Sequence, residues 1–242
     1  MSDLGSALRS GAVDLSRRTI ARMYENPFWE ARFGARGRVH AEADGIHHVE
    51  HLAEAIDWEM PSVMIRYAQW LRPILVTRGM CTRHLEDTFT ALAAAISERR
   101  IDSTGTAAEY LRAARESLLY PSGAAREIQD GADEIADRAT DALYRRHPQW
   151  EARWGPAGRE RCRDDLLYHL SYLADATAMD RPDLFAGYVA WIAGFLDDRG
   201  VEGAHMDATL AALERELSSA GSHLRAAVTI VSAARDEIDD RP

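Results

Sequence analysis

The sequence predicts an all-α protein that contains two copies of one domain, joined head to tail. The segment PFWEARFGARGR, which begins at Pro27, recurs as PQWEARWGPAGR from Pro148, an offset of 148 − 27 = 121 residues. Over 71 positions from Pro27 onward, 24 residues are identical to their counterparts at this offset. Apolar residues recur at helical spacing, and no alternating run rich in Val, Ile or Thr indicates a strand. We expect repeat 1 to span residues 1–121 and repeat 2 to span 122–242.

Each repeat is expected to contain five helices, because the same start and stop signals occur in both. Pro61 and Pro182 suit the first turn of a third helix, and Gly79 and Gly200 follow a basic residue as helix stops. The breaker cluster at 120–123 separates the repeats. The expected helices are 3–25, 36–57, 61–77, 81–99 and 104–119 in repeat 1, and 123–146, 157–178, 182–198, 202–219 and 222–239 in repeat 2.

Composition and charge narrow the classes of function. The chain has 242 residues, of which 46% are hydrophobic and 28% charged, and its net charge of −10 argues against binding to nucleic acid or to an anionic membrane surface. The N-terminus lacks the pattern of a secretory signal, and no apolar run is long enough for a transmembrane helix. Cys81 and Cys162 are interpreted as free thiols of a cytoplasmic protein.

The second helix of each repeat carries polar residues that both copies keep. Asp44 and His48 in repeat 1 correspond to Asp165 and His169 in repeat 2, one helical turn apart. Cys162 precedes Asp165 by three residues and lies on the same face. Because these residues share an otherwise apolar stripe, we expect them to point toward the interior, where each needs a partner.

The segment CRDDLLYHL, residues 162–170, resembles the chromophore-binding helix of phycobiliproteins. That family has a cysteine, an acid three residues on, a tyrosine three further and then a leucine, and Cys162, Asp165, Tyr168 and Leu170 match these places. Asp164 departs from the pattern, because the family has an arginine before the acid. The wider pattern is similar to bilin-binding, globin-like domains related to phycobiliproteins. The resemblance implies a tandem duplication of a five- to six-helix globin-like domain.

The resemblance also implies a bilin, an open-chain tetrapyrrole such as biliverdin or phycocyanobilin. Asp44 and Asp165 would accept its pyrrole N–H groups, and His48 and His169 would bond a ring carbonyl. A thiol can add to a bilin side chain, and only repeat 2 has one, at Cys162.

Other residues would complete the implied pocket. Arg32 and Arg153 would clamp the propionates, and Tyr168 belongs to the motif itself. His84 and His205 are interpreted first as residues of a helix start and second as pocket contacts. The flat rings would lie between aromatic walls formed by Tyr67, Trp70, Tyr188 and Trp191.

Each assignment has a structural alternative. The aspartates could pair with Arg32 and Arg153 as buried ion pairs, the histidines and tryptophans could be core residues, and Cys162 could be a small buried side chain. His47 and His51 are spaced to share a metal, but repeat 2 does not keep them, and we expect no metal site.

The expected function is that of a bilin-binding protein: a photosensor, a pigment carrier or a partner of bilin metabolism. One alternative is a heme-binding globin-type sensor, although neither third helix contains the histidine that globins use. Another is a ligand-free interaction module whose repeats form a pseudo-dimer within one chain. We expect no enzyme, because no phosphate-binding loop or nucleophile elbow occurs, and a signalling or bilin-biosynthesis partner would carry the output.

Overall fold

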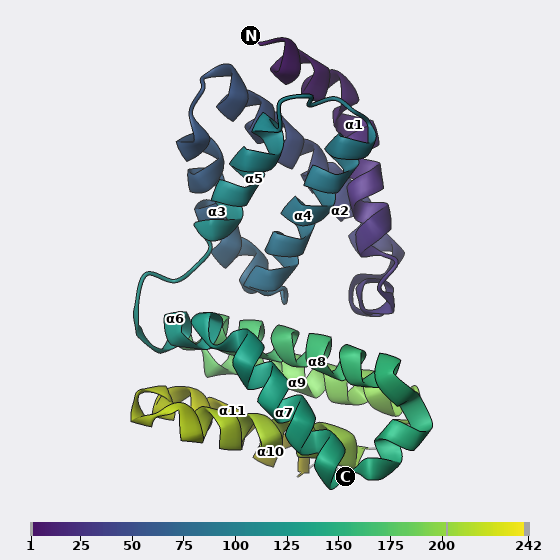
Figure 1. Cartoon of the computed structure of the whole chain (residues 1–242), viewed down its shortest axis with the longest axis vertical. Coiled ribbons are helices and arrows are strands. Elements are labelled where there is room, and N and C mark those ends of the chain that lie inside the picture. The colour runs from purple at the N-terminus through teal and green to yellow at the C-terminus, as the bar shows by residue number, and fades with distance from the viewer. Residues whose placement is uncertain (1, 202, 240–242) are drawn as a thin grey trace. The chain divides into compact units, whose positions relative to one another are not determined.

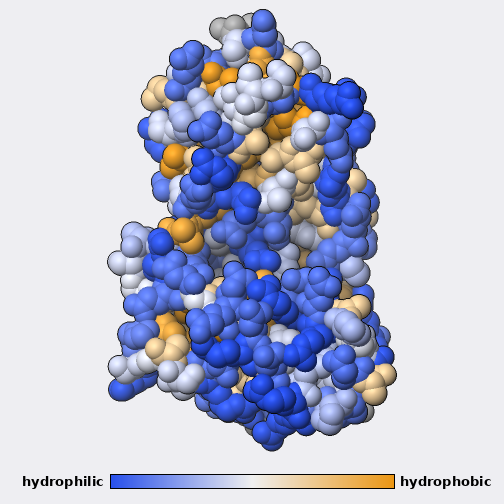
Figure 2. All heavy atoms as spheres, viewed as in Figure 1, coloured by the Kyte–Doolittle hydropathy of each residue, from blue (hydrophilic) through white to orange (hydrophobic). Residues whose placement is uncertain are grey.

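The protein is all-helical in the part of the chain that its computed structural model describes, residues 2–201 and 203–239. By internal contacts it divides into two compact units. Unit 1 comprises Met1–Leu75 and Thr82–Leu119, and unit 2 comprises Val76–Cys81 and Tyr120–Pro242. No helix in the described ranges has an apolar stretch long enough to cross a membrane. The face in Figure 2 is mainly hydrophilic, with hydrophobic atoms in scattered places.

The helices follow one another as Figure 1 labels them. In the first half of the chain they are α1 (Asp3–Met23), α2 (Pro27–Asp57), α3 (Pro61–Val76), α4 (Thr82–Glu98) and α5 (Thr106–Glu116). In the second half they are α6 (Gly123–Asp130), α7 (Ala132–Arg146), α8 (Pro148–Ala178), α9 (Pro182–Asp197), α10 (Gly203–Ala220), the 3₁₀ turn η1 (Ser222–Leu224) and α11 (Arg225–Asp239).

Matching elements recur at the offset seen in the sequence. The first residues of α2, α3 and α4 differ from those of α8, α9 and α10 by 121 positions in each case. The packing partners also correspond: α1 packs on α2 and α4, and α7 packs on α8 and α10. Glu59 and Asp180, which lie two residues after the ends of α2 and α8, both have a positive φ, of 54° and 50°.

Apolar side chains on the inner faces form a core in each unit. In unit 1, Leu15, Leu52, Met64 and Phe89 are completely buried and bring α1, α2, α3 and α4 together. Complete burial of such side chains contributes about 2 kcal/mol each. In unit 2, Phe185, Leu210 and Val231 are likewise completely buried, on α9, α10 and α11. The helices are therefore held mainly by apolar packing.

Two expected boundaries are wrong. The second helices begin at Pro27 and Pro148, not at 36 and 157, because the chain bends sharply at a glycine and then continues as helix. The expected helix 123–146 is divided at Gly131 into α6 and α7. The expected helix 202–219 begins at Glu202, which lies outside the described residues.

Glycines at and just after the bend are required for different reasons: Gly34 and Gly155 for their backbone conformation, and Gly37 for close packing. Gly34 has φ 60° and ψ −171°, and Gly155 has φ 59° and ψ −162°, a region that side chains with a Cβ rarely adopt. A Cβ on Gly37 would lie 2.4 Å from the Phe33 Cβ, so close packing requires glycine at position 37.

We expect Gly34→Ala and Gly155→Ala each to destabilise the protein by about 1–3 kcal/mol, because alanine is strained at these dihedral angles. Urea unfolding followed by circular dichroism measures this. Gly187→Ala is the control: this exposed glycine lies inside α9 with open space at its Cβ position, and alanine there favours the helix. Unchanged stability in both bend variants would contradict the role of the bend.

Candidate functional site

The crossing of the second and third helices brings most of the sequence-predicted residues together. In unit 1, Nδ1 of His48 on α2 lies 2.7 Å from the hydroxyl oxygen of Tyr67 on α3. In unit 2, Nδ1 of His169 on α8 lies 2.8 Å from the hydroxyl oxygen of Tyr188 on α9. All four side chains are buried. An equivalent hydrogen bond therefore joins the second and third helices of each unit.

Burial keeps these histidines neutral. Loss of hydration, together with a smaller effect of the nearby His51 and His47, lowers the pKa of His48 to about 4. Burial also lowers the pKa of His169 to about 4, with a smaller contribution from His205. The same loss of hydration raises the pKa of the Tyr67 hydroxyl, and the charge of Asp44 adds to this effect. Asp44 thus lies close enough to this pair to influence it.

The expected inward orientation of Asp44 is wrong. Its side chain is exposed, and it forms no ion pair with any residue in the described ranges. Asp165 is less open: 48% of its side chain is exposed, and its Oδ1 lies 3.3 Å from Nε of Arg161. Partial desolvation raises the pKa of Asp165 to about 6, so it is mainly ionised at neutral pH. Both carboxylates lie at the rim of the helix crossing, because one turn separates them from the buried histidines.

Aromatic rings cover the outer side of each crossing, in different ways. In unit 1, His51 stacks on Tyr67 with ring centroids 3.9 Å apart, and the Trp70 ring lies 6.1 Å from Tyr67. Trp70 is 62% exposed. In unit 2, Tyr172 takes the place of His51 and stacks on Tyr188 at 3.6 Å. Trp191 is half-buried and stacks on Phe195 at 5.2 Å.

Cys162 and Tyr168 are both half-buried on α8. Burial raises the pKa of the Cys162 thiol to about 12, and the charge of Asp165 raises it further. A hydrogen bond with Thr140 on α7 opposes this change but does not reverse it. The thiol is therefore protonated at neutral pH, which makes it a poor nucleophile. The structure favours the interpretation of Cys162 as a packed side chain.

Arg32, His84, Arg153 and His205 belong to a second cluster, formed at the bend of α2 and α8. His84 is completely buried, stacked on Phe28 at 5.0 Å and edge-on to Trp29 at 5.0 Å. Burial lowers its pKa to about 3, with further effects of Arg32 and Arg83.

The equivalent cluster in unit 2 has the same arrangement. The His205 ring lies 4.0 Å from Trp150, and the Arg153 guanidinium lies 5.0 Å from the Trp154 ring centroid. The interpretation of His84 and His205 as residues of a helix start understates their packing. Through these rings, α4 packs on the bent first turns of α2, and α10 packs on those of α8.

Two contributors to the crossing were not identified as site residues from the sequence: His51 and Tyr172. His51 and Tyr172 lie one turn after His47 and Tyr168, so helical spacing could have placed them near the stripe, but their stacking on α3 and α9 depends on tertiary structure. Arg66 is exposed on α3, one turn before Trp70. Within the described residues, no group of three or more His, Cys, Asp or Glu side chains could hold a metal ion.

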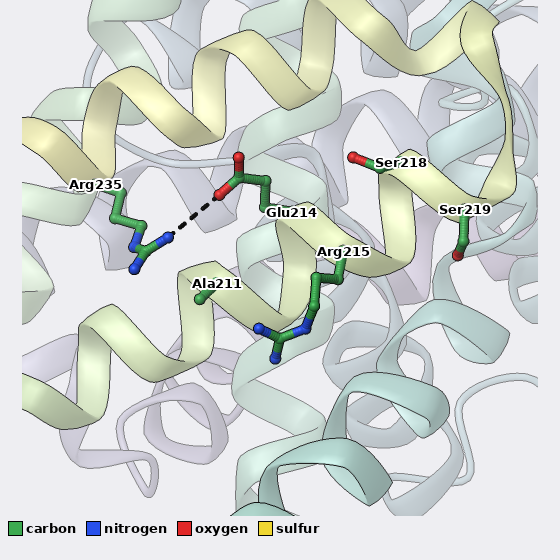
Figure 3. A pocket seen from close by; sticks show the side chains of 6 residues that line it. All are labelled: Ala211, Glu214, Arg215, Ser218, Ser219 and Arg235. Atoms are coloured by element: carbon green, nitrogen blue, oxygen red, sulfur yellow. Dashed lines mark hydrogen bonds and ion pairs between the residues drawn. The ribbon is translucent and has the colours of Figure 1, made fainter.

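A separate hollow of about 480 Å³ lies on unit 2, between α10 and α11. Figure 3 shows Glu214 pointing toward Arg235, with Nη1 to Oε2 at 3.4 Å, and Ser218 and Ser219 in the last turn of α10. The hollow is shallow and open, and none of the sequence-predicted site residues lines it.

Comparison of the chain with protein-family models, with curated proteins and with solved structures finds no match. These comparisons link the chain neither to phycobiliproteins nor to globins, so the arguments for its function come from its own residues.

The buried histidines predict a loss of stability in acid. Because the folded pKa of His48 and His169 is about 4 and the ordinary value is 6.5, the unfolded chain binds more protons between these values. Stability is therefore lost as the pH falls from about 6.5 to about 4, by at most roughly 3 kcal/mol for each histidine.

Urea unfolding at a series of pH values measures this decline. The double variant His48→Gln/His169→Gln should decline less steeply than the wild type, and His40→Gln, at an exposed position, should keep the wild-type slope. An equal slope in the double variant would show that these histidines are not the groups that titrate.

Proposed function

We propose that the protein binds a bilin where the second and third helices of a unit cross, as α2 and α3 do in unit 1. We also propose that it arose by tandem duplication of a globin-like domain. One observation carries the binding proposal: exposed polar and aromatic groups flank a buried hydrogen-bonded pair. His48 and Tyr67 form this pair, and the Trp70 ring lies 6.1 Å from Tyr67. Asp44 precedes His48 by one helical turn. A carboxylate and an exposed aromatic ring suit a flat, conjugated ligand with inner N–H donors.

Each group has a defined part in holding such a ligand. The Asp44 carboxylate is an acceptor for pyrrole N–H groups, and such charge-assisted hydrogen bonds are stronger than neutral ones. Trp70 offers an exposed ring face for stacking. His48 and Tyr67 lie beneath as a rigid, hydrogen-bonded support that fixes the spacing of α2 and α3. A bilin such as biliverdin or phycocyanobilin supplies an extended conjugated system that absorbs visible light.

The residues fit a ligand bound on a surface better than one enclosed in a pocket. Asp44 is exposed, and Trp70 has most of its surface in solvent. The raised pKa of Cys162 favours noncovalent binding, because thioether formation starts from a thiolate.

The duplication is supported by features that recur 121 residues apart. These are the bends at Gly34 and Gly155, the His–Tyr hydrogen bonds, and the positive φ of Glu59 and Asp180. The biological role we propose is that of a light sensor, a pigment carrier or a partner of bilin metabolism in the cytoplasm, with its output through another protein.

Heme is the second candidate, since a neutral imidazole is the form that ligates iron and His48 and His169 remain neutral at physiological pH. Bilin binding is favoured because neither α3 nor α9 contains a histidine, the residue by which globins hold heme iron.

Expression with and without a heme oxygenase, which produces biliverdin, separates these proposals. We expect the purified protein to show a red absorption band only when the oxygenase is present. A sharp Soret band without the oxygenase would support heme. A colourless protein in both cultures, which also fails to bind added biliverdin or hemin, would contradict both proposals.

A further inference from the structure

The helix crossings of the two units differ at the positions that a bilin would touch. The carboxylates differ first. Asp44 forms no ion pair within residues 2–201 and 203–239, whereas Asp165 is paired with Arg161. His40 stands in unit 1 where Arg161 stands in unit 2. A ligand at unit 2 would have to compete with this arginine, and a ligand at unit 1 would not.

The second difference is a cation. Arg66 and Trp70 lie one turn apart on α3 and share a face of the helix. Arg66 is exposed and forms no ion pair within the described parts of the chain, so its guanidinium is available to a propionate. The equivalent position in α9 is Gly187, which has no side chain. The third helix of unit 2 therefore has no cation at the position of Arg66.

The third difference is the aromatic surface. Trp70 is 62% exposed, whereas Trp191 is half-buried with one face against Phe195. Ile74 stands at the position of Phe195 in unit 1. The stacking face that is open in unit 1 is thus partly covered in unit 2 by a side chain of the same helix.

We propose that the chain binds one bilin, noncovalently, on the face of unit 1 formed by Asp44, Arg66 and Trp70, and that the equivalent face of unit 2 does not bind. This inference rests on the proposed bilin-binding function. It assigns Arg66, in place of Arg32, as the propionate partner, because Arg32 lies near the buried His84 at the bend of α2. In unit 2 the His–Tyr pair keeps only its structural role.

Titration of the full chain with biliverdin, followed by absorbance and by quenching of tryptophan fluorescence, tests the stoichiometry. We expect one bilin per chain, released completely on a denaturing gel, so that no zinc-enhanced fluorescence remains on the protein band. Trp70→Ala and Asp44→Asn should each weaken binding at least tenfold. Arg66→Gly, which introduces the residue found in unit 2, should weaken it several-fold, and more at low than at high salt.

The matched variants Trp191→Ala and Asp165→Asn are the controls, and both should bind as the wild type does. Asp44 and Trp70 are both exposed, so circular dichroism should show that their variants remain folded. Two bilins per chain, or loss of binding in the unit 2 variants alone, would overturn this assignment while leaving bilin binding intact. Absence of any bilin binding would overturn the proposed function together with it.

Discussion

The hydrogen bond between a buried histidine and a buried tyrosine sets the register of each helix crossing, within helices that apolar packing holds together. It joins α2 to α3 through His48 and Tyr67, and α8 to α9 through His169 and Tyr188. A buried imidazole without a partner would be costly, so the bond fixes which residues of the two helices face each other. This register places Asp44 and Trp70 at the rim of the same crossing. The polar pair is therefore the support of the candidate site.

The bent second helix is the other constraint shared by the two units. Gly34 has a backbone conformation that other residues rarely adopt, and it bends the first two turns of α2 away from the rest of the helix. His84 of α4 packs among the aromatic rings of these turns. In unit 2, Trp150 and His205 form the same contact. His84 and Arg32, which both recur in unit 2, therefore lie at the bend and not at the helix crossing with His48 and Tyr67. The residues that the sequence assigned to one pocket thus belong to two clusters in each unit, one at the helix crossing and one at the bend.

The differences between the units lie at the rim of the crossing, whereas the similarities lie below it. The buried His–Tyr pair is the same in both, because a change there would leave a polar group unsatisfied. Exposed positions are under no such restriction. Gly187 stands at the position of Arg66, and Asp165 has an ion-pair partner, whereas Asp44 has none among the residues that the structure describes.

The all-helical class and most helix bounds followed from the sequence by itself, since helical spacing, prolines and glycine stops are local signals. The recurrence of Asp44, His48, Tyr67 and Trp70 at one offset also identified the residues that meet at the crossing. Tertiary structure alone decided which of them are buried. A stripe on a helix has a rim as well as a centre, and only the packing of α3 shows that His48 lies at the centre and Asp44 at the rim. The helical segment before Gly34 was not predicted for a related reason. Glycine is a common helix stop, and the packing of Trp29 against His84, which stabilises this segment, depends on tertiary structure.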